Sequence, residues 1–141
     1  MSSTDDFSLA YALLRVTLGV NITMHGISRI QAGVGVFTAV LERQFAATPL
    51  PHFAVRAFGS ALPWAEALVG LLILVGGATR IALVAGGLLI LVLTFGSALH
   101  QDWEIAGLQL IYASVYSLLI AFRKYNLLSL DRLLARSRRN G

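Results

Sequence analysis

Residues 61–95 read ALPWAEALVGLLILVGGATRIALVAGGLLILVLTF, and this stretch decides the fold class. Two apolar runs are separated only by the four residues 76–79, and the stretch holds two charged side chains, Glu66 and Arg80. A helix that crosses a membrane needs about 20 mainly apolar residues, and a connection of four residues permits only an antiparallel hairpin. The pattern therefore predicts two spanning helices, over residues 52–76 and 80–99.

The rest of the chain extends this pattern on both sides. It has 141 residues, of which 57% are hydrophobic and 13% are charged, against about 25% charged residues in a soluble domain. Two further apolar runs cover residues 9–30 and 105–122. We therefore expect an all-α integral membrane protein, an antiparallel four-helix bundle forming a single domain over residues 1–141. A fifth span or a second soluble domain is excluded by length.

The two longer polar segments also carry helical patterns. In the first loop, residues 32–59, Phe37, Leu41 and Phe45 recur at helical spacing and predict a short amphipathic helix at the membrane interface. In the tail, residues 123–141, leucines alternate with arginines, which is typical of a basic helix that lies on the membrane.

The basic residues outside the spans predict the orientation. Seven lie on the side that holds both termini and the 76–79 turn, whereas the other side has Arg43 and Arg56. Basic residues favour the cytoplasmic side, so we expect both termini in the cytoplasm and the chain in the cytoplasmic membrane of a bacterium or archaeon. Residues 1–7 lack a basic segment, and no cleaved signal peptide is expected.

Polar side chains inside the spans are candidates for function because they are costly in lipid. On the first span, Asn21, His25 and Arg29 share one helix face. At about 1.5 Å per residue, His25 and Glu66 lie at similar depths below the outer ends of their helices. We predict an outer pocket with His25 and Glu66 as catalytic residues and with Asn21, Arg29, Gln109 and Tyr112 as ligand-binding residues.

Simpler roles are also open for these residues. The alternative for Glu66 is a structural ion pair in which it neutralises Arg29 or Arg56. The alternative for His25 is a core histidine bonded to a carbonyl. Arg15 lies about two turns from the cytoplasmic end of its helix, by 1.5 Å per residue, and is expected to extend its charge toward water.

Metal chemistry is disfavoured. The chain has no cysteine, which excludes thiolate metal sites, iron–sulfur clusters and dithiol redox chemistry carried by its own residues. A haem held by His25 and His100 would require ligands at different depths. A zinc site would have only these two histidines and Glu66, and structural zinc usually takes four ligands. No metal is predicted.

Several short motifs resemble those of a known family. LRVTLG at 14–19 with MHGISR at 24–29, and LPWAEALVG at 62–70 with LVGGATR at 74–80, resemble the first two helices of the DoxX/DoxD family of small four-helix membrane proteins. FG at 95–96, QDW at 101–103, QLIY at 109–112 and LSLD at 128–131 are similar to the later segments of that family.

The resemblance implies a redox setting. DoxD-type proteins are subunits of a thiosulfate:quinone oxidoreductase that needs a DoxA-type subunit, and other relatives are associated with membrane oxidoreductase complexes. This chain supplies no DoxA-type domain, so the sulfur chemistry is not carried over.

Together these features favour an integral membrane subunit of a quinone-linked oxidoreductase or respiratory-type complex. A quinone or similar lipid ligand would bind near the outer pocket, where the polar side chains exchange protons with the outer side. The alternative is a non-catalytic structural or assembly subunit, and a small-solute transporter is a third, disfavoured hypothesis. The expected partners are membrane lipid and other membrane or redox subunits or a second copy of the chain, and not nucleic acid.

Overall fold

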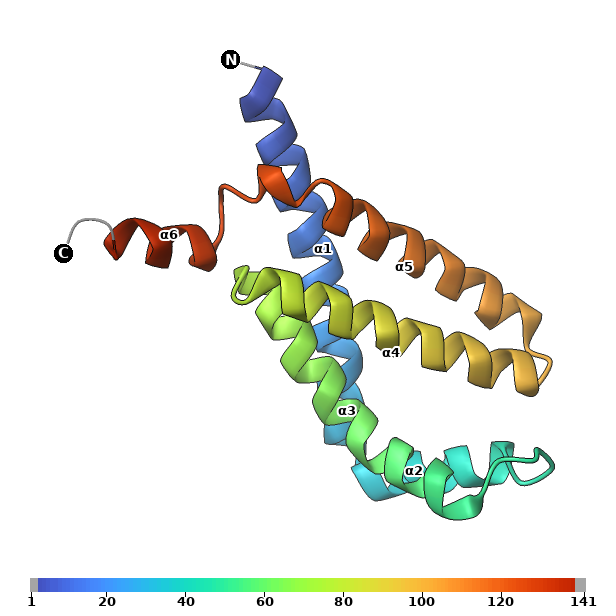
Figure 1. Ribbon diagram of the computed structural model, residues 1–141. Helices are drawn as coiled ribbons and strands as arrows, with labels where there is room; N and C mark the ends of the chain where they lie inside the picture. Colours follow the sequence, from blue (N-terminus) through green and yellow to red (C-terminus); the bar gives the residue numbers. More distant parts are fainter. Residues whose placement is uncertain (1–2, 139–141) are drawn as a thin grey trace.

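The computed structural model describes residues 3–138, and every regular element in that range is a helix (Figure 1). The predicted all-α fold is therefore confirmed. Arg139, which belongs to the predicted basic tail, lies outside the described residues. In chain order the helices are α1 (Ser3–Ala32), α2 (Val34–Gln44), α3 (His52–Val75), α4 (Thr79–Leu99), α5 (Trp103–Ala121), the short 3-10 helix η1 (Arg123–Tyr125) and α6 (Leu130–Ser137).

Four of these helices match the predicted spans. α1, α3, α4 and α5 are each long and apolar enough to cross a membrane. Their ends agree with the predicted ends within a few residues, except that α1 begins at Ser3 rather than near residue 9. Asp5 and Asp6 lie in its first turn, where carboxylates stabilise the positive end of the helix dipole, so the helix extends through the polar segment.

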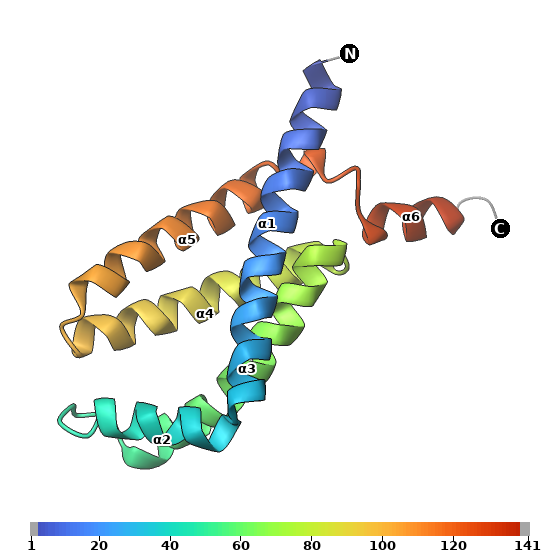
Figure 2. The same ribbon diagram turned by 180° about the vertical axis from the view of Figure 1, so that it is seen from behind.

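The molecule has two distinct ends (Figures 1 and 2). The start of α1, the α3–α4 turn, η1 and α6 lie at one end, which we call the tail end. α2 and the α4–α5 turn lie at the opposite end, which we call the loop end. The helices predicted for the first loop and for the tail are both present, as α2 and α6.

α1 and α3 pack closely because three glycines lie at their interface. A Cβ atom added to Gly19 would lie 2.6 Å from the Cα of Leu74, and one added to Gly26 or Gly70 would collide with the backbone of the opposite helix. Small residues let spanning helices approach to backbone contact. This pair therefore forms the most closely packed part of the fold.

α4 and α5 form a second pair. Gly86 of α4 receives the ring of Tyr116 from α5, and Ala82 is buried one turn away. Figures 1 and 2 show that this pair crosses the α1–α3 pair near the tail end and then extends away from it. Of the most apolar stretch of each helix, 33% in α1 and 39% in α3 is buried, against 22% in α4 and 17% in α5. The α4–α5 pair therefore offers most of its surface to lipid or to partners.

The turn between α3 and α4 is a Schellman motif. Gly76 adopts a left-handed conformation with φ of 69°, Gly77 N donates to Leu72 O at 2.9 Å, and Gly76 N donates to Ile73 O at 3.2 Å. Glycine is favoured there because it has no Cβ atom to clash in the left-handed region. Ala78 follows with φ of 45°, so it lies in the turn rather than on a helix face.

Candidate functional site

The predicted site residues of α1 lie where this helix passes between α3 and α5. Asn21, His25 and Arg29 follow four-residue spacing, so they occupy adjacent turns of one helix face. Arg29, the nearest of the three to the loop end, contacts α3, and Asn21, the nearest to the tail end, contacts α5. α1 therefore carries polar groups to both neighbouring helices.

Arg29 and Glu66 form an ion pair between α1 and α3. Nη1 of Arg29 donates to the carboxylate of Glu66, whose side chain is only 7% exposed. The guanidinium also stacks over the ring of Phe37 from α2, with Cζ 4.8 Å from the ring centroid. Gly26 packs against the backbone of Pro63 and Ala67, at the level of Glu66, and Gly70 packs against Thr23 one turn further along α3. Of the two partners considered for Glu66, the structure therefore selects Arg29.

Asn21 and Tyr112 form a second polar contact, between α1 and α5. The hydroxyl of Tyr112 donates to Oδ1 of Asn21 at 3.1 Å. Tyr116, one turn further along α5, is buried against Gly86 of α4. The tyrosines of α5 thus contact both α1 and α4.

Gln109 lies one turn before Tyr112 on α5 and is half-buried. Its Oε1 atom is buried, and within residues 3–138 no group donates a hydrogen bond to it. A buried acceptor without a donor is uncommon in proteins. This oxygen is therefore a candidate acceptor for a donor group of a ligand.

His25 is exposed on α1, one turn from Asn21 and one turn from Arg29. The alternative prediction of a buried core histidine is therefore wrong. The sequence could not show this, because it does not give the relative directions of the helices, and α5 diverges from α1 toward the loop end (Figure 1). Among the described residues, no hydrogen bond or ion pair to His25 occurs.

Within residues 3–138, no three His, Cys, Asp or Glu side chains gather closely enough to hold a metal ion. His100, considered above as a haem ligand, contacts the ring of Phe45, with ring centroids 6.0 Å apart. This contact connects the end of α2 to the end of α4.

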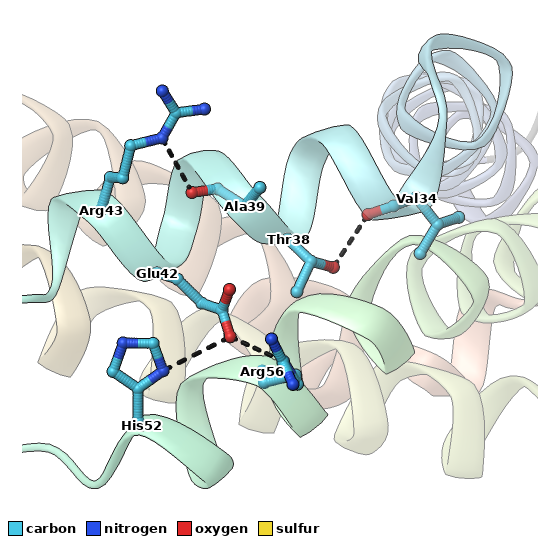
Figure 3. Close-up of polar contacts among 7 residues, drawn as sticks. All are labelled: Val34, Thr38, Ala39, Glu42, Arg43, His52 and Arg56. Carbon is cyan, nitrogen blue, oxygen red and sulfur yellow. Dashed lines mark hydrogen bonds and ion pairs between the residues drawn. The ribbon is translucent and has the colours of Figure 1, made fainter.

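The loop end has its own charged cluster (Figure 3). Glu42 of α2 accepts a hydrogen bond from Nε of Arg56 at 2.8 Å, and its carboxylate lies 3.5 Å from Nδ1 of His52. Both partners are on the first turns of α3 and are exposed. Arg56 is therefore engaged with Glu42 and does not neutralise Glu66.

A second buried arginine lies at the tail end, and here the prediction is wrong. Arg15 was expected to extend toward water, but it is only 3% exposed. It donates to the carbonyls of Ile73 at 2.6 Å, Leu74 at 2.7 Å and Leu128 at 2.7 Å. The last carbonyls of a helix have no partner within the helix, so the end of α3 attracts the guanidinium. The available signal was the spacing of Arg15 and Gly19 on one face of α1.

Asp131 of α6 extends this arrangement to α4. Its carboxylate accepts hydrogen bonds from Ala78 N at 2.7 Å and Thr79 N at 2.8 Å, and its own N–H donates to Gly76 O at 3.0 Å. Partial burial acts to raise the pKa of Asp131, but the hydrogen bonds from Thr79 and Ala78 outweigh it and hold the pKa below its ordinary value. We call Arg15, Asp131 and their partners the tail clasp.

Comparison with known families now adds to this geometry. A family model described as methylamine utilisation protein MauE matches residues 8–105. The chain belongs to the MauE family. The match runs from within α1 to the first turn of α5 and therefore includes His25, Arg29 and Glu66, whereas Gln109 and Tyr112 of α5 lie beyond it.

The other comparisons give no further relatives of this MauE-family protein. Neither the curated proteins nor the solved structures contain a match. The family model that matches is that of MauE and not that of DoxX, so the resemblance to the DoxX/DoxD family is not confirmed and stays a prediction. Membership of a membrane protein family agrees with the four spans.

Proposed function

We propose that this MauE-family protein is an integral membrane subunit of a quinone-linked oxidoreductase or respiratory-type complex, and that a quinone head group binds at His25. One observation carries the proposal. His25 is an exposed imidazole on a spanning helix, one turn from each of two polar contacts, and it has no partner within the described residues.

The cost of an unpartnered imidazole explains why a ligand is expected. Lipid tails offer no hydrogen bonds, so an unsatisfied polar group in the hydrocarbon region is unfavourable by several kcal/mol. Such a group is normally covered by a ligand, by water in a cavity or by another helix. His25 therefore marks the part of α1 that something else covers in the membrane.

A quinone fits the groups available there. Its head group has carbonyl oxygens that accept hydrogen bonds, and its apolar tail can lie against exposed helix surface. When bound, a quinone accepts two electrons and two protons. In this chain the imidazole of His25 would donate to a quinone oxygen and exchange protons. Oε1 of Gln109, which has no donor among residues 3–138, would accept a hydrogen bond from the reduced form. The absence of cysteine means that electrons must reach the site from a partner subunit or a second cofactor.

The family description adds a physiological setting. It names methylamine utilisation, and we extend this to the chain as part of the proposal. Loss of the gene should then impair growth on methylamine and leave growth on ammonium unchanged. Equal growth of the deletion strain on both would separate this chain from the process named in its family.

The binding proposal is tested by comparing two histidines of the same chain. His25→Ala should lower the quinone content of the purified protein or its complex by at least about tenfold, on the scale of lost acid–base groups. His52→Ala, at the loop end, should leave it unchanged. Glu66→Gln keeps the side-chain shape and should lower quinone-linked turnover on the same scale. Parental quinone content in His25→Ala would contradict the proposal.

A second candidate function is a structural or assembly role. It is favoured by the direct ion pair of Arg29 with Glu66, which neutralises the buried carboxylate within the chain itself. In this case His25 is covered by a helix of a partner. His25→Ala would then reduce co-purification of partner subunits, while the assembled fraction would keep its parental activity.

We also propose that the tail end faces the cytoplasm. Because the chain has no cysteine, single cysteines can report the orientation. Cysteines at Ser3 and Ser137 should resist a membrane-impermeant thiol reagent in intact cells, and one at Thr48 should react. The reverse pattern would place His25 nearer the cytoplasmic side.

A further inference from the structure

A groove of about 740 Å³ runs along the outside of α4 at the tail end. α4 forms its floor, and the segment after α5 and the start of α6 form its rim. The six residues that matter below are Arg80, Ile81, Val84, Leu88, Arg123 and Asp131. None of them belongs to the Arg29–Glu66 or Asn21–Tyr112 contact, and only Asp131 belongs to the tail clasp.

The rim of the groove is cationic. Arg80 and Arg123 are exposed, and within the described part of the chain neither side chain has an ion pair or hydrogen bond. Asp131 lies close enough to Arg123 for their charges to interact. Both carboxylate oxygens of Asp131, however, already accept hydrogen bonds from the start of α4. The donors of the two guanidinium groups therefore remain available to an anion.

The floor of the groove is apolar and leads away from this rim. Ile81, Val84 and Leu88 follow three- and four-residue spacing, so they line one face of α4, and all three are exposed. At 1.5 Å per residue, the track from Ile81 to Leu88 is about 10 Å long. This apolar track, formed by Ile81, Val84 and Leu88, runs from Arg80 and Arg123 toward the middle of α4.

We propose that this groove binds one anionic phospholipid. Its phosphate lies between Arg80 and Arg123, and an acyl chain lies along Ile81, Val84 and Leu88. Guanidinium groups bind phosphate through paired, charge-assisted hydrogen bonds, and basic pockets beside spanning helices on the cytoplasmic side select anionic head groups. A soluble phosphate would leave the apolar track uncovered, and a neutral lipid would leave the two arginines without a net opposing charge.

The test uses the intact protein in detergent, with native mass spectrometry to count retained lipids. Phosphatidylglycerol and phosphatidylcholine with identical acyl chains are added in equal amounts. The double variant R80Q/R123Q should lose the preference for phosphatidylglycerol by about tenfold, on the scale of two basic contacts near a membrane surface. The control R132Q/R136Q removes the same charge from α6 at the same end and should keep the preference within about twofold.

Three results would overturn the proposal. They are an equal loss in both double variants, no preference in the parent protein, and displacement of the lipid by inorganic phosphate alone. The first would indicate general attraction to the basic tail end, and the last would indicate a phosphate site that does not use the track. Melting temperatures of all variants are measured in parallel, and R80Q and R123Q singly give the same comparison if the double variant is less stable.

Discussion

α1 carries two arginines that both reach α3, and the two are satisfied in different ways. Arg29 meets a carboxylate, Glu66, near the loop end. Arg15 meets only backbone carbonyls near the tail end, including those of Ile73 and Leu74. The Arg29 contact joins opposite charges from two side chains, whereas Arg15 places a positive charge at the negative end of the α3 dipole.

The difference has consequences for function. A pair of charged side chains can be disturbed by a charged ligand, because each group can exchange its partner. Arg15 is more deeply buried and joins α1, the end of α3 and the segment before α6. It therefore acts as a structural connection, whereas the proposed ligand site lies near Arg29.

The largest expected effect comes from breaking the charge pair on one side. Arg29→Met leaves Glu66 buried without its counter-charge and should lower the free energy of unfolding by about 3 to 5 kcal/mol. The double variant with Glu66→Met should recover most of this loss, since an apolar pair of similar size replaces the ions. Chemical denaturation in mixed micelles measures both. If the double variant is as unstable as the single one, the pair is not the source of the effect.

A somewhat smaller effect is expected at Arg15. Arg15→Met leaves the carbonyls of Leu74 and Leu128 without this donor, leaves that of Ile73 with only its bond from Gly76 N, and should cost about 3 kcal/mol, by the cost of unsatisfied buried groups. The segment before α6 should also become more sensitive to protease. Arg43→Met, an exposed arginine of α2, is the matched control. If Arg15→Met kept the parental stability and the protease resistance of the tail, the tail clasp would not depend on Arg15.

Asp131 gives a weaker effect with a defined pH dependence. Its folded pKa lies below the ordinary value of 3.8, so its contribution to stability is complete above that pH and is lost as the pH falls through the lower folded pKa. Asp131→Asn should cost about 1 to 2 kcal/mol at neutral pH, because one acceptor for the α4 N–H groups is lost. Melting curves below pH 4 should show the parent approaching the variant. A constant difference at every pH would contradict this role.

The smallest effect is expected where α1 meets α5. Tyr112→Phe removes the hydrogen bond to Asn21 and should lower stability by about 1 kcal/mol. Tyr125→Phe is the control, since within residues 3–138 its hydroxyl makes no hydrogen bond. Differential scanning fluorimetry measures both. A cost well above that of Arg15→Met would place the main structural contact of α1 at α5 instead of α3.

Some features of this structure could be predicted from the sequence, and others could not. The four spans follow from the length of the apolar runs, and the turn at Gly76 follows from its glycines, because both signals are local. His25 and Glu66 were predicted at similar depths, since position along a helix converts directly into height, whereas in the structure Glu66 pairs with Arg29, one turn further along α1. Their helices are neighbours in a short bundle, so the contact was among the expected alternatives.

What the sequence determined by itself is the number of spans, the two smaller helices and the position of each polar side chain along its helix, because these depend on spacing along one helix. The tertiary structure decided which sides of the helices meet. Gly19, Gly26 and Gly70 bring α1 against α3, α5 diverges and leaves His25 exposed, and Arg15 finds its acceptors in backbone carbonyls. Such carbonyls are present at every position and carry no side-chain pattern, so only the assembled fold shows which of them an arginine reaches.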